Sequence, residues 1–314
     1  MSAYRKRGKC FAAENSPRLH HRKNPEVEAA IICRRFRIHL RIPGQKSLFH
    51  SVVEGVYVTT LTGTDKQWER MAKRDPYFAV LSDTAYLAKT LKPEAREEFF
   101  RSGERHVEHV LGEIRTHLAS AFQPKRILDY GCGVGRLTIA FAKSDAAIVT
   151  GVDVSPTMLS HARTNCDGNG ASVRLLGYEE MKSLTPGSFD LIHSYIVFQH
   201  IPIARGEGIF RELIDLLSDG GIGAIHLTFH NRRSVLRHGM DIVRKRVPMV
   251  HGLINIARGR PYSMCRGEMN AYSMNQVLNI LYEKKCSNLR MEFSDHGTAI
   301  GVMLYFQKRE AIPL

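Results

Sequence analysis

Apolar residues recur with two different periods along this chain. Between about residues 65 and 122 the spacing is helical. Asp65 is expected to cap a first helix that ends near Pro76, a second short helix is expected over 84–91, and Pro93 favours the start of a long third helix. In that third helix, apolar residues recur at steps of three and four and define one buried stripe: Phe99, Phe100, Val107, Val110, Leu111, Ile114 and Leu118.

From residue 125 onward, short β-branched runs alternate with helical stretches. The expected strands are 126–129, 147–152, 173–176, 189–193 and 222–229, and the expected helices between them are 137–143, 156–166 and 203–217. Apolar strands separated by helices of this length pair in parallel through crossovers, so both faces of the sheet are covered.

The C-terminal end departs from this alternation. After a helix expected over 274–284, strands at 289–293 and 299–306 are joined by only five residues, too few for a crossover. These two strands must therefore be antiparallel. The predicted fold class is α/β, with a doubly wound, mostly parallel, seven-stranded sheet, a C-terminal antiparallel hairpin and additional N-terminal helices.

Composition divides the chain into three expected parts. Its 314 residues carry a formal charge of +14, of which residues 1–50 hold +9. We interpret 1–60 as a basic, disordered extension, 61–122 as a helical lid, and 123–314 as the α/β domain with a basic cap insert at 230–267. The extension could also serve as a nucleic-acid arm or an organelle presequence, or have no function.

The class of protein is narrowed by what the sequence does not contain. No run approaches the roughly 18 apolar residues that a membrane span needs, so we expect a soluble, cytoplasmic protein. Its six cysteines lie far apart with no CxxC pair, which indicates reduced thiols and predicts no metal site.

The turn after the first expected strand is rich in glycine. In Ile127-Leu-Asp-Tyr-Gly-Cys-Gly-Val-Gly135, bare backbone and a helix N-terminus can press against a ligand. A P-loop is disfavoured because no Lys-Ser/Thr pair follows at the right spacing. The dinucleotide fingerprint does not match fully, because Arg136 takes the place of its third glycine. Asp129, two residues before the first glycine, supplies a carboxylate suited to a cationic ligand end.

A second acid, Asp153, closes the next expected strand and is placed to hold a pair of ribose hydroxyls. One acid for an aminoacyl ammonium and one for a ribose describe S-adenosylmethionine. On these residues the chain resembles the class I S-adenosylmethionine-dependent methyltransferase family over about residues 125–308. Further motifs that carry the resemblance are Gly151–Leu159 (GVDVSPTML), Ser188–Ser194 (SFDLIHS), Phe198–Pro202 (FQHIP) and Leu217–Gly221 (LSDGG).

The resemblance implies which residues bind S-adenosylmethionine. They belong to the glycine turn and to the segments after the second, third and fourth strands: Asp129, Gly131, Cys132, Gly133, Asp153, Val154, Met158, Tyr178, Glu179 and Ser194. Relatives often carry an acid after the third strand to meet the adenine amine, whereas this chain has Gly177-Tyr178. Tyr178 or Glu179 is therefore expected to take that part.

Methyl transfer from a sulfonium requires in-line orientation and a water-poor pocket, and a base only when the acceptor enters protonated. The expected catalytic residues, Tyr195 and His200, follow the fourth strand. For His200 the alternative is a structural histidine at a helix start.

The acceptor is the least constrained part of the prediction. The basic insert 230–267 lies where family members build substrate caps, and its cations suit an anionic small molecule or form a solvated face. Nucleic acid is disfavoured as a partner, because the residues after the fourth strand match neither the amino-methylase motif nor the cytosine-C5 cysteine.

We therefore expect methyl transfer to oxygen or nitrogen of a small, polar or anionic acceptor. The alternatives are an RNA or protein methyltransferase that uses the basic surface, and a non-catalytic protein that binds an adenosyl ligand. The sequence does not predict the oligomeric state.

Overall fold

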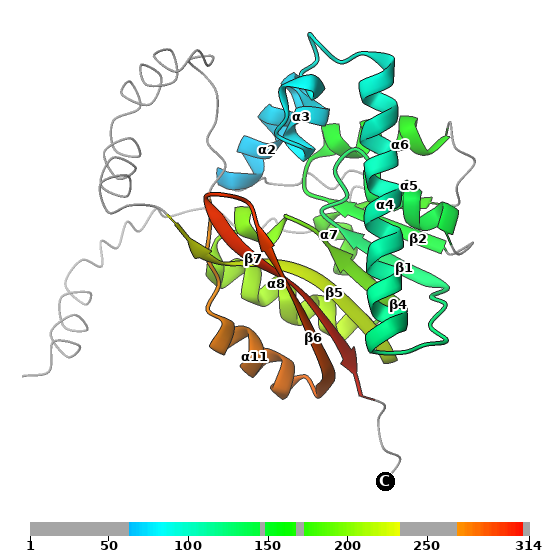
Figure 1. Cartoon of the computed structure of the whole chain (residues 1–314), viewed down its shortest axis with the longest axis vertical. Coiled ribbons are helices and arrows are strands. Elements are labelled where there is room, and N and C mark those ends of the chain that lie inside the picture. Colours follow the sequence, from blue (N-terminus) through cyan, green and yellow to red (C-terminus); the bar gives the residue numbers. More distant parts are fainter. Residues whose placement is uncertain (1–62, 145–147, 168–172, 233–268, 310–314) are drawn as a thin grey trace, which may run out of the picture. The chain divides into compact units, whose positions relative to one another are not determined.

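The computed structural model describes residues 63–144, 148–167, 173–232 and 269–309, and in this part of the chain seven strands form one sheet (Figure 1). The expected extension 1–60 and all but the first three residues of the insert 230–267 lie outside the described residues. The strands in chain order are β1 (Arg126–Tyr130), β2 (Ile148–Asp153), β3 (Val173–Gly177), β4 (Phe189–Ser194), β5 (Leu217–Asn231), β6 (Cys286–Asp295) and β7 (Ala299–Lys308).

The strand order across the sheet is β3-β2-β1-β4-β5-β7-β6, with β1 to β5 parallel and β7 antiparallel to both of its neighbours. The chain moves from β1 outward to β3 and then returns to β4 on the other side of β1, so the sheet is doubly wound. Both the predicted fold class and the predicted C-terminal hairpin are confirmed.

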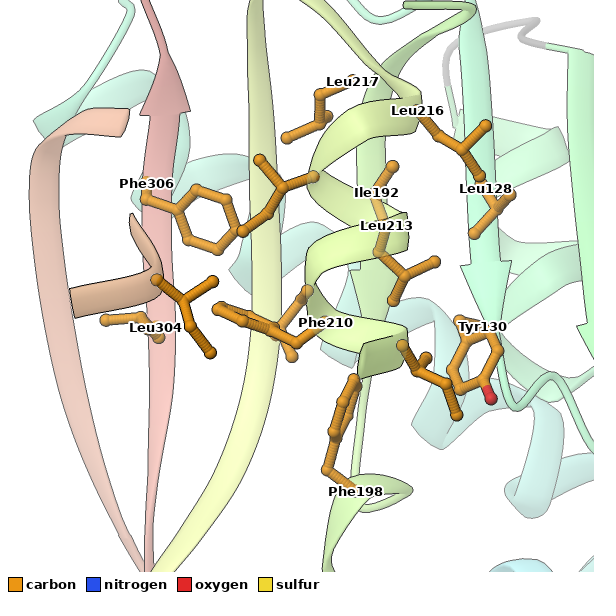
Figure 2. Close-up of a cluster of buried hydrophobic side chains, with 14 of the residues drawn as sticks. Leu128, Tyr130, Ile192, Phe198, Phe210, Leu213, Leu216, Leu217, Leu304 and Phe306 are labelled. Atoms are coloured by element: carbon orange, nitrogen blue, oxygen red, sulfur yellow. The ribbon is translucent and has the colours of Figure 1, made fainter. Parts of the chain in front are cut away.

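Helices cover both faces of the sheet. On one face pack α4 (Pro93–His117) and α5 (Arg136–Ser144), and on the other α8 (Ile203–Leu216) and α11 (Met274–Glu283). We call the hydrophobic cluster under α4 and α5 the first core and the cluster under α8 and α11 the second core. Figure 2 shows the second core, in which the rings of Phe210 of α8 and Phe306 of β7 pack with centroids 5.8 Å apart. The predicted stripe of α4 is confirmed, because most of its members are buried in the first core or beside it.

Alternation along β1 decides where its polar residue points. Ile127 belongs to the core under α4 and α5, whereas Leu128 and Tyr130 belong to the opposite core. Because side chains of a strand alternate between faces, Asp129 shares the face of Ile127. The parallel register places Asp129 beside His193 of β4.

The N-terminal helices differ from the prediction in detail. They are α2 (Gly63–Arg74), α3 (Pro76–Val80) and the short 3-10 turn η1 (Thr84–Tyr86). The prediction that Asp65 caps the first helix is wrong: the helix starts at Gly63, and the Asp65 carboxylate pairs with Arg205 of α8 at 2.7 Å.

The prediction of a helix over 84–91 is also wrong, because only the 3-10 turn η1 forms there. The Asp83 carboxylate accepts from the amide of Ala85 at 2.9 Å, and the Thr90 hydroxyl donates to the carbonyl of Thr84 at 2.8 Å. These local side-chain hydrogen bonds compete with a continuous helical ladder.

Two further α-helices and one 3-10 turn complete the described elements. The helix α6 (Pro156–Asp167) lies where the sequence predicts it, while α7 (Tyr178–Met181) and η2 (Phe198–His200) were not predicted. None of the described helices combines the length and apolar content that crossing a membrane requires.

Candidate functional site

A cavity of about 1060 Å³ opens at the carboxyl ends of β1, β2 and β4. This is where the strand order changes direction, the position at which doubly wound α/β domains bind ligands. The sheet contributes the glycine turn, the end of β2 and the segment after β4, and the remaining walls come mainly from α2, α3, η1 and the residues between and after them. The helical segment expected to form a lid therefore borders the cavity.

The glycine turn is tied to the end of β2. The amides of Gly131 and Cys132 donate to the carbonyl of Val152 at 2.7 and 3.0 Å. Gly131 has a φ of +78° and its added Cβ would lie 2.2 Å from a methyl carbon of Val197, so only glycine fits there. Gly131 and Gly133 line the cavity with bare backbone, as the sequence predicts.

Asp153 lies on the cavity wall at the end of β2. Its Oδ2 accepts from the amide of Gly133 at 2.9 Å and its Oδ1 from the amide of Ser155 at 2.8 Å. Burial raises the pKa of Asp153 to about 6, an effect that the two amides oppose. Val154 and Met158 line the same cavity, so a hydrogen-bonding acid and apolar surface stand side by side.

The Asp129 carboxylate is 2% exposed and is directed into the layer beneath α4 and α5. Its Oδ2 accepts from the Thr138 hydroxyl at 2.7 Å, and its Oδ1 lies 3.0 Å from His193 Nδ1. His193 Nε2 in turn lies 3.1 Å from His106 Nε2. Asp129 is not one of the described residues lining the cavity, so its contact with a ligand ammonium stays a prediction.

The direction of this hydrogen-bond chain follows from the carboxylate, which can only accept. His193 Nδ1 must therefore donate, and in the neutral ring its Nε2 accepts from His106. Burial, His193 and Arg136 lower the pKa of His106 to about 2, so His106 is neutral at physiological pH. The chain of hydrogen bonds joins β1, β4 and α4 through two imidazoles.

Two other residues expected to contact the cofactor, Cys132 and Ser194, are buried and do not line the cavity. Cys132 is buried against Gly151, and the Ser194 hydroxyl donates to the carbonyl of Tyr130 at 2.9 Å. Neither is among the described lining residues. They support the turn from behind, and a direct role in binding stays a prediction.

The segment after β3 also lies off the described wall. The Tyr178 hydroxyl donates to Glu212 at 3.3 Å, and burial together with Glu212 raises the pKa of Tyr178 to about 12. Glu179 pairs with Lys182 at 2.8 Å. The expected adenine contacts of Tyr178 and Glu179 are not tested by this geometry.

Tyr195 and His200 both line the cavity. The Tyr195 ring lies 4.1 Å from that of His106, and burial raises its pKa. The His200 ring packs edge-on against Trp68 at 4.7 Å, and its Nε2 lies 3.1 Å from Gln199 Nε2. The structure thus brings both expected catalytic side chains to one cavity, while their roles stay predictions.

Sequence reasoning missed several residues of the cavity. Trp68 was read only as a helix residue, and Ile196 has a φ of 60°, which is unusual for a β-branched side chain. Arg136 entered only as a mismatch to other motifs, yet it is buried and lines the cavity. Its place immediately after the last glycine of the turn was the available signal.

The doubly wound sheet, the glycine turn and the acid at the end of β2 define a nucleoside-binding α/β domain. Residues 127–221 match the family model described as methyltransferase domain. Residues 127–221 therefore form a methyltransferase domain. The sheet around them has the fold that the resemblance to the class I S-adenosylmethionine-dependent methyltransferases implies.

Relatives agree with this assignment. The chain is 31% identical over 118 residues to the ubiquinone biosynthesis O-methyltransferase of Xanthomonas euvesicatoria, a match that covers 36% of this chain and 48% of the relative. It is 36% identical over 95 residues to the ribosomal protein L11 methyltransferase of Pectobacterium carotovorum, covering 30% and 29%. The chain thus spans about half the length, or less, of these curated relatives.

A solved structure shows the same fold. The magnesium protoporphyrin IX methyltransferase of Synechocystis with bound S-adenosylmethionine aligns with a TM-score of 0.50 and 15% identity, over 80% of this chain and 99% of that one. The cofactor of the family is S-adenosylmethionine. The donor set fits it, since Asp153 offers carboxylate oxygens to a ribose, Val154 and Met158 offer apolar surface, and the glycine turn offers bare backbone.

Proposed function

We propose that this chain transfers the methyl group of S-adenosylmethionine to an oxygen or nitrogen atom of a small, polar or anionic acceptor. The cavity carries the proposal. Small-molecule pockets measure about 300–1,000 Å³, so a cavity of about 1060 Å³ has room for a nucleoside cofactor and a small acceptor together. The O-methyltransferase name of the Xanthomonas relative supports oxygen as one target.

The chain's own residues would orient the two ligands and keep water away. S-adenosylmethionine supplies a methyl group that is already activated on a sulfonium. Asp153 and the glycine turn fix one ligand against the sheet, while Trp68 and the neighbouring residues of α2 and α3 close the other side with apolar surface. Such positioning is the main contribution a protein can make to this displacement.

An acceptor that enters protonated also needs a base. Tyr195 and His200 border the cavity at the segment after β4, and we assign the proton transfer to one of them. Gln199 Oε1 accepts from the Thr228 hydroxyl at 2.9 Å, so its amide nitrogen donates toward His200 Nε2. This hydrogen bond occupies the acceptor lone pair of the His200 imidazole, and the raised pKa of Tyr195 keeps its hydroxyl protonated. Ligand binding must therefore change the surroundings of either residue before it can accept a proton.

The test is to incubate the purified full chain with methyl-tritiated S-adenosylmethionine and a cell extract. The extract is then separated into small molecules, RNA and protein. We expect label in the small-molecule fraction, and its loss with Asp153→Ala, which should weaken cofactor binding by about 1–3 kcal/mol. The matched control is Asp190→Ala, because Asp190 pairs with Arg126 at the amino end of β1 and not at the cavity.

The other outcomes identify the alternatives. Label that enters RNA or protein in place of small molecules contradicts the proposed acceptor class and supports a macromolecular methyltransferase. Calorimetric binding of S-adenosylhomocysteine without label in any fraction supports a non-catalytic binding protein.

A further inference from the structure

Arg136 is a buried cation on the wall of the cavity. It is the first residue of α5, it is 5% exposed, and its guanidinium lies over the Phe99 ring at 5.9 Å. One nitrogen, Nη1, donates to the Ser102 hydroxyl at 3.1 Å, whereas Nε is buried and makes no hydrogen bond. In the part of the chain that the structure describes, Arg136 forms no ion pair with a carboxylate.

Among the described residues, the Arg136 guanidinium lacks further hydrogen-bond partners and a paired carboxylate. It presents five N–H donors, and a buried charge is costly unless it is paired and hydrogen-bonded. Asp129 acts on Arg136 electrostatically, but its two oxygens accept from Thr138 and His193. Burial accordingly lowers the pKa of Arg136. An anion placed in the cavity would supply the missing partner.

The side chain is held in place by α4. A Cβ on Gly103 would lie 2.6 Å from the Arg136 carbonyl oxygen and 3.0 Å from its Cγ, so glycine permits α4 to approach α5 this closely. Phe99 and Ser102 of the same helix contact the guanidinium. Arg136 is therefore preorganised, and an incoming anion would not have to order a mobile side chain.

The other cations of the cavity are already paired or exposed. Arg74 and Arg205, which also line it, pair with Asp75 and Asp65, each at 2.7 Å. Lys89 is exposed. One buried guanidinium without a carboxylate matches a planar monoanion, and the forked N–H groups of arginine suit both oxygens of a carboxylate.

We propose that Arg136 is the carboxylate receptor of the cavity, a proposal that rests on the small-acceptor function. The carboxylate has two chemical sources, the acceptor and the methionine part of the cofactor. Arg136 lines the same cavity as Tyr195, which stands on the wall after β4, so the guanidinium faces the space expected to hold the acceptor.

Binding to the full chain and to Arg136→Met distinguishes the sources. In the first arm, calorimetry compares S-adenosylhomocysteine with the same compound lacking its carboxyl group. In the second arm, benzoate is compared with benzamide at saturating S-adenosylhomocysteine. In the arm whose ligand binds to Arg136 through its carboxylate, the wild type should bind the carboxylate compound about 10- to 100-fold more tightly than the compound without it. Arg136→Met should abolish this difference in affinity.

The ligand-free variant provides a second readout. Removal of an unpaired buried charge should leave the melting temperature of Arg136→Met unchanged or raised. Arg101→Met, an exposed arginine of α4 paired with Glu97, is the matched control and should keep the preference. If Arg136→Met does not fold, Arg136→Lys, which keeps the charge but not the fork, should bind the carboxylate more weakly than the wild type.

Several results would overturn the proposal: no carboxylate preference in either arm for the wild type, a preference that survives in Arg136→Met, or full affinity in a folded Arg136→Lys. Both arms measure binding without turnover. Failure here therefore leaves methyl transfer untouched, and an extract without labelled small molecules leaves carboxylate binding untouched.

Discussion

At the scale of single residues, Asp153 has a charge that changes near neutral pH. Burial raises its pKa to about 6, so the ionised carboxylate lowers the stability of the ligand-free fold increasingly from pH 3.8 to about 6 and by a constant amount above. The ionised form is the better acceptor of ribose hydroxyls. We therefore expect affinity for S-adenosylhomocysteine to weaken from pH 7 to pH 5, by up to about tenfold per pH unit below 6.

Calorimetric titration across this pH range checks the prediction. Asp153→Asn, which cannot ionise, should bind more weakly and with no pH dependence from this group. An affinity that stays flat in the wild type between pH 7 and pH 5 would separate Asp153 from the binding of the cofactor.

His200 is expected to act through packing. Its ring contacts Trp68, and its Nε2 receives the amide of Gln199. His200→Ala should lower the free energy of unfolding by roughly 1 kcal/mol, while turnover stays within a few-fold. Urea unfolding and a methyl-transfer assay on the same preparation test this. A loss of at least a hundredfold in turnover with folding and cofactor affinity intact would instead make His200 the base.

The sequence predicts site residues placed by local turns and strand ends better than it predicts contacts between distant segments. Gly131, Gly133 and Asp153 follow from strand ends and turn geometry, because those features are local. Asp129 is different, since its partners Thr138 and His193 come from α5 and β4 and are brought to it only by the sheet register. Long-range partners of this kind are not encoded in motif spacing.

At the scale of elements, one face of α2 connects this helix to three other segments. Asp65, Trp68 and Glu69 recur at steps of three and four, so they share that face. Asp65 pairs with Arg205 of α8, and Trp68 packs on His200 of η2. Glu69 accepts from hydroxyl groups at the start of α6, those of Ser155 and Thr157, each at 2.6 Å.

We expect Glu69→Ala to reduce the free energy of unfolding by about 1–3 kcal/mol, because it leaves two hydroxyls and one amide without their charged acceptor. Burial raises the pKa of Glu69, but the hydrogen bonds from Ser155 and Thr157 outweigh it and hold the pKa below 4.5. The contribution is thus complete above pH 4.5 and is lost as the pH falls through the lowered value.

Urea unfolding at pH 7 measures the loss. Glu97→Ala is the matched control, because Glu97 is 71% exposed, and an exposed ion pair contributes about 0–1 kcal/mol. Equal effects of the two substitutions would show that Glu69 does not anchor α2.

Strong periodicity made most elements predictable. The alternating strands and helices and the long helix from Pro93 follow from it. The prediction of a helix over 84–91 is wrong because the side chains of Asp83 and Thr90 form hydrogen bonds with nearby backbone. The prediction of Asp65 as a helix cap is wrong because its carboxylate pairs with a distant arginine, Arg205. Tertiary partners override local propensity in such segments.

At the scale of the whole molecule, buried histidines predict sensitivity to acid. Burial lowers the pKa of His106 to about 2 and that of His226 to about 3, and neighbouring ionisable side chains add to both shifts. The unfolded chain takes up protons below pH 6.5 that the folded chain does not. Stability should therefore be complete above pH 6.5 and fall by up to about 1.4 kcal/mol per pH unit for each histidine.

Denaturant unfolding between pH 8 and pH 5 tests this. His226→Asn should reduce the slope, whereas His109→Asn should retain it, because His109 is an exposed histidine beside Glu292. Unfolding free energies that do not change between pH 7 and pH 5 would contradict the assignment of neutral, buried imidazoles.

The three contacts of α2 have a consequence for the timing of catalysis. Asp65, Trp68 and Glu69 are fixed to one rigid helix, so moving that helix away from the cavity breaks its contacts with α8, η2 and α6 together. Opening is then an all-or-none event, and product escape waits for it. We therefore expect the first methyl transfer to be faster than those that follow, and the steady-state rate to report the movement of α2 and not the chemistry.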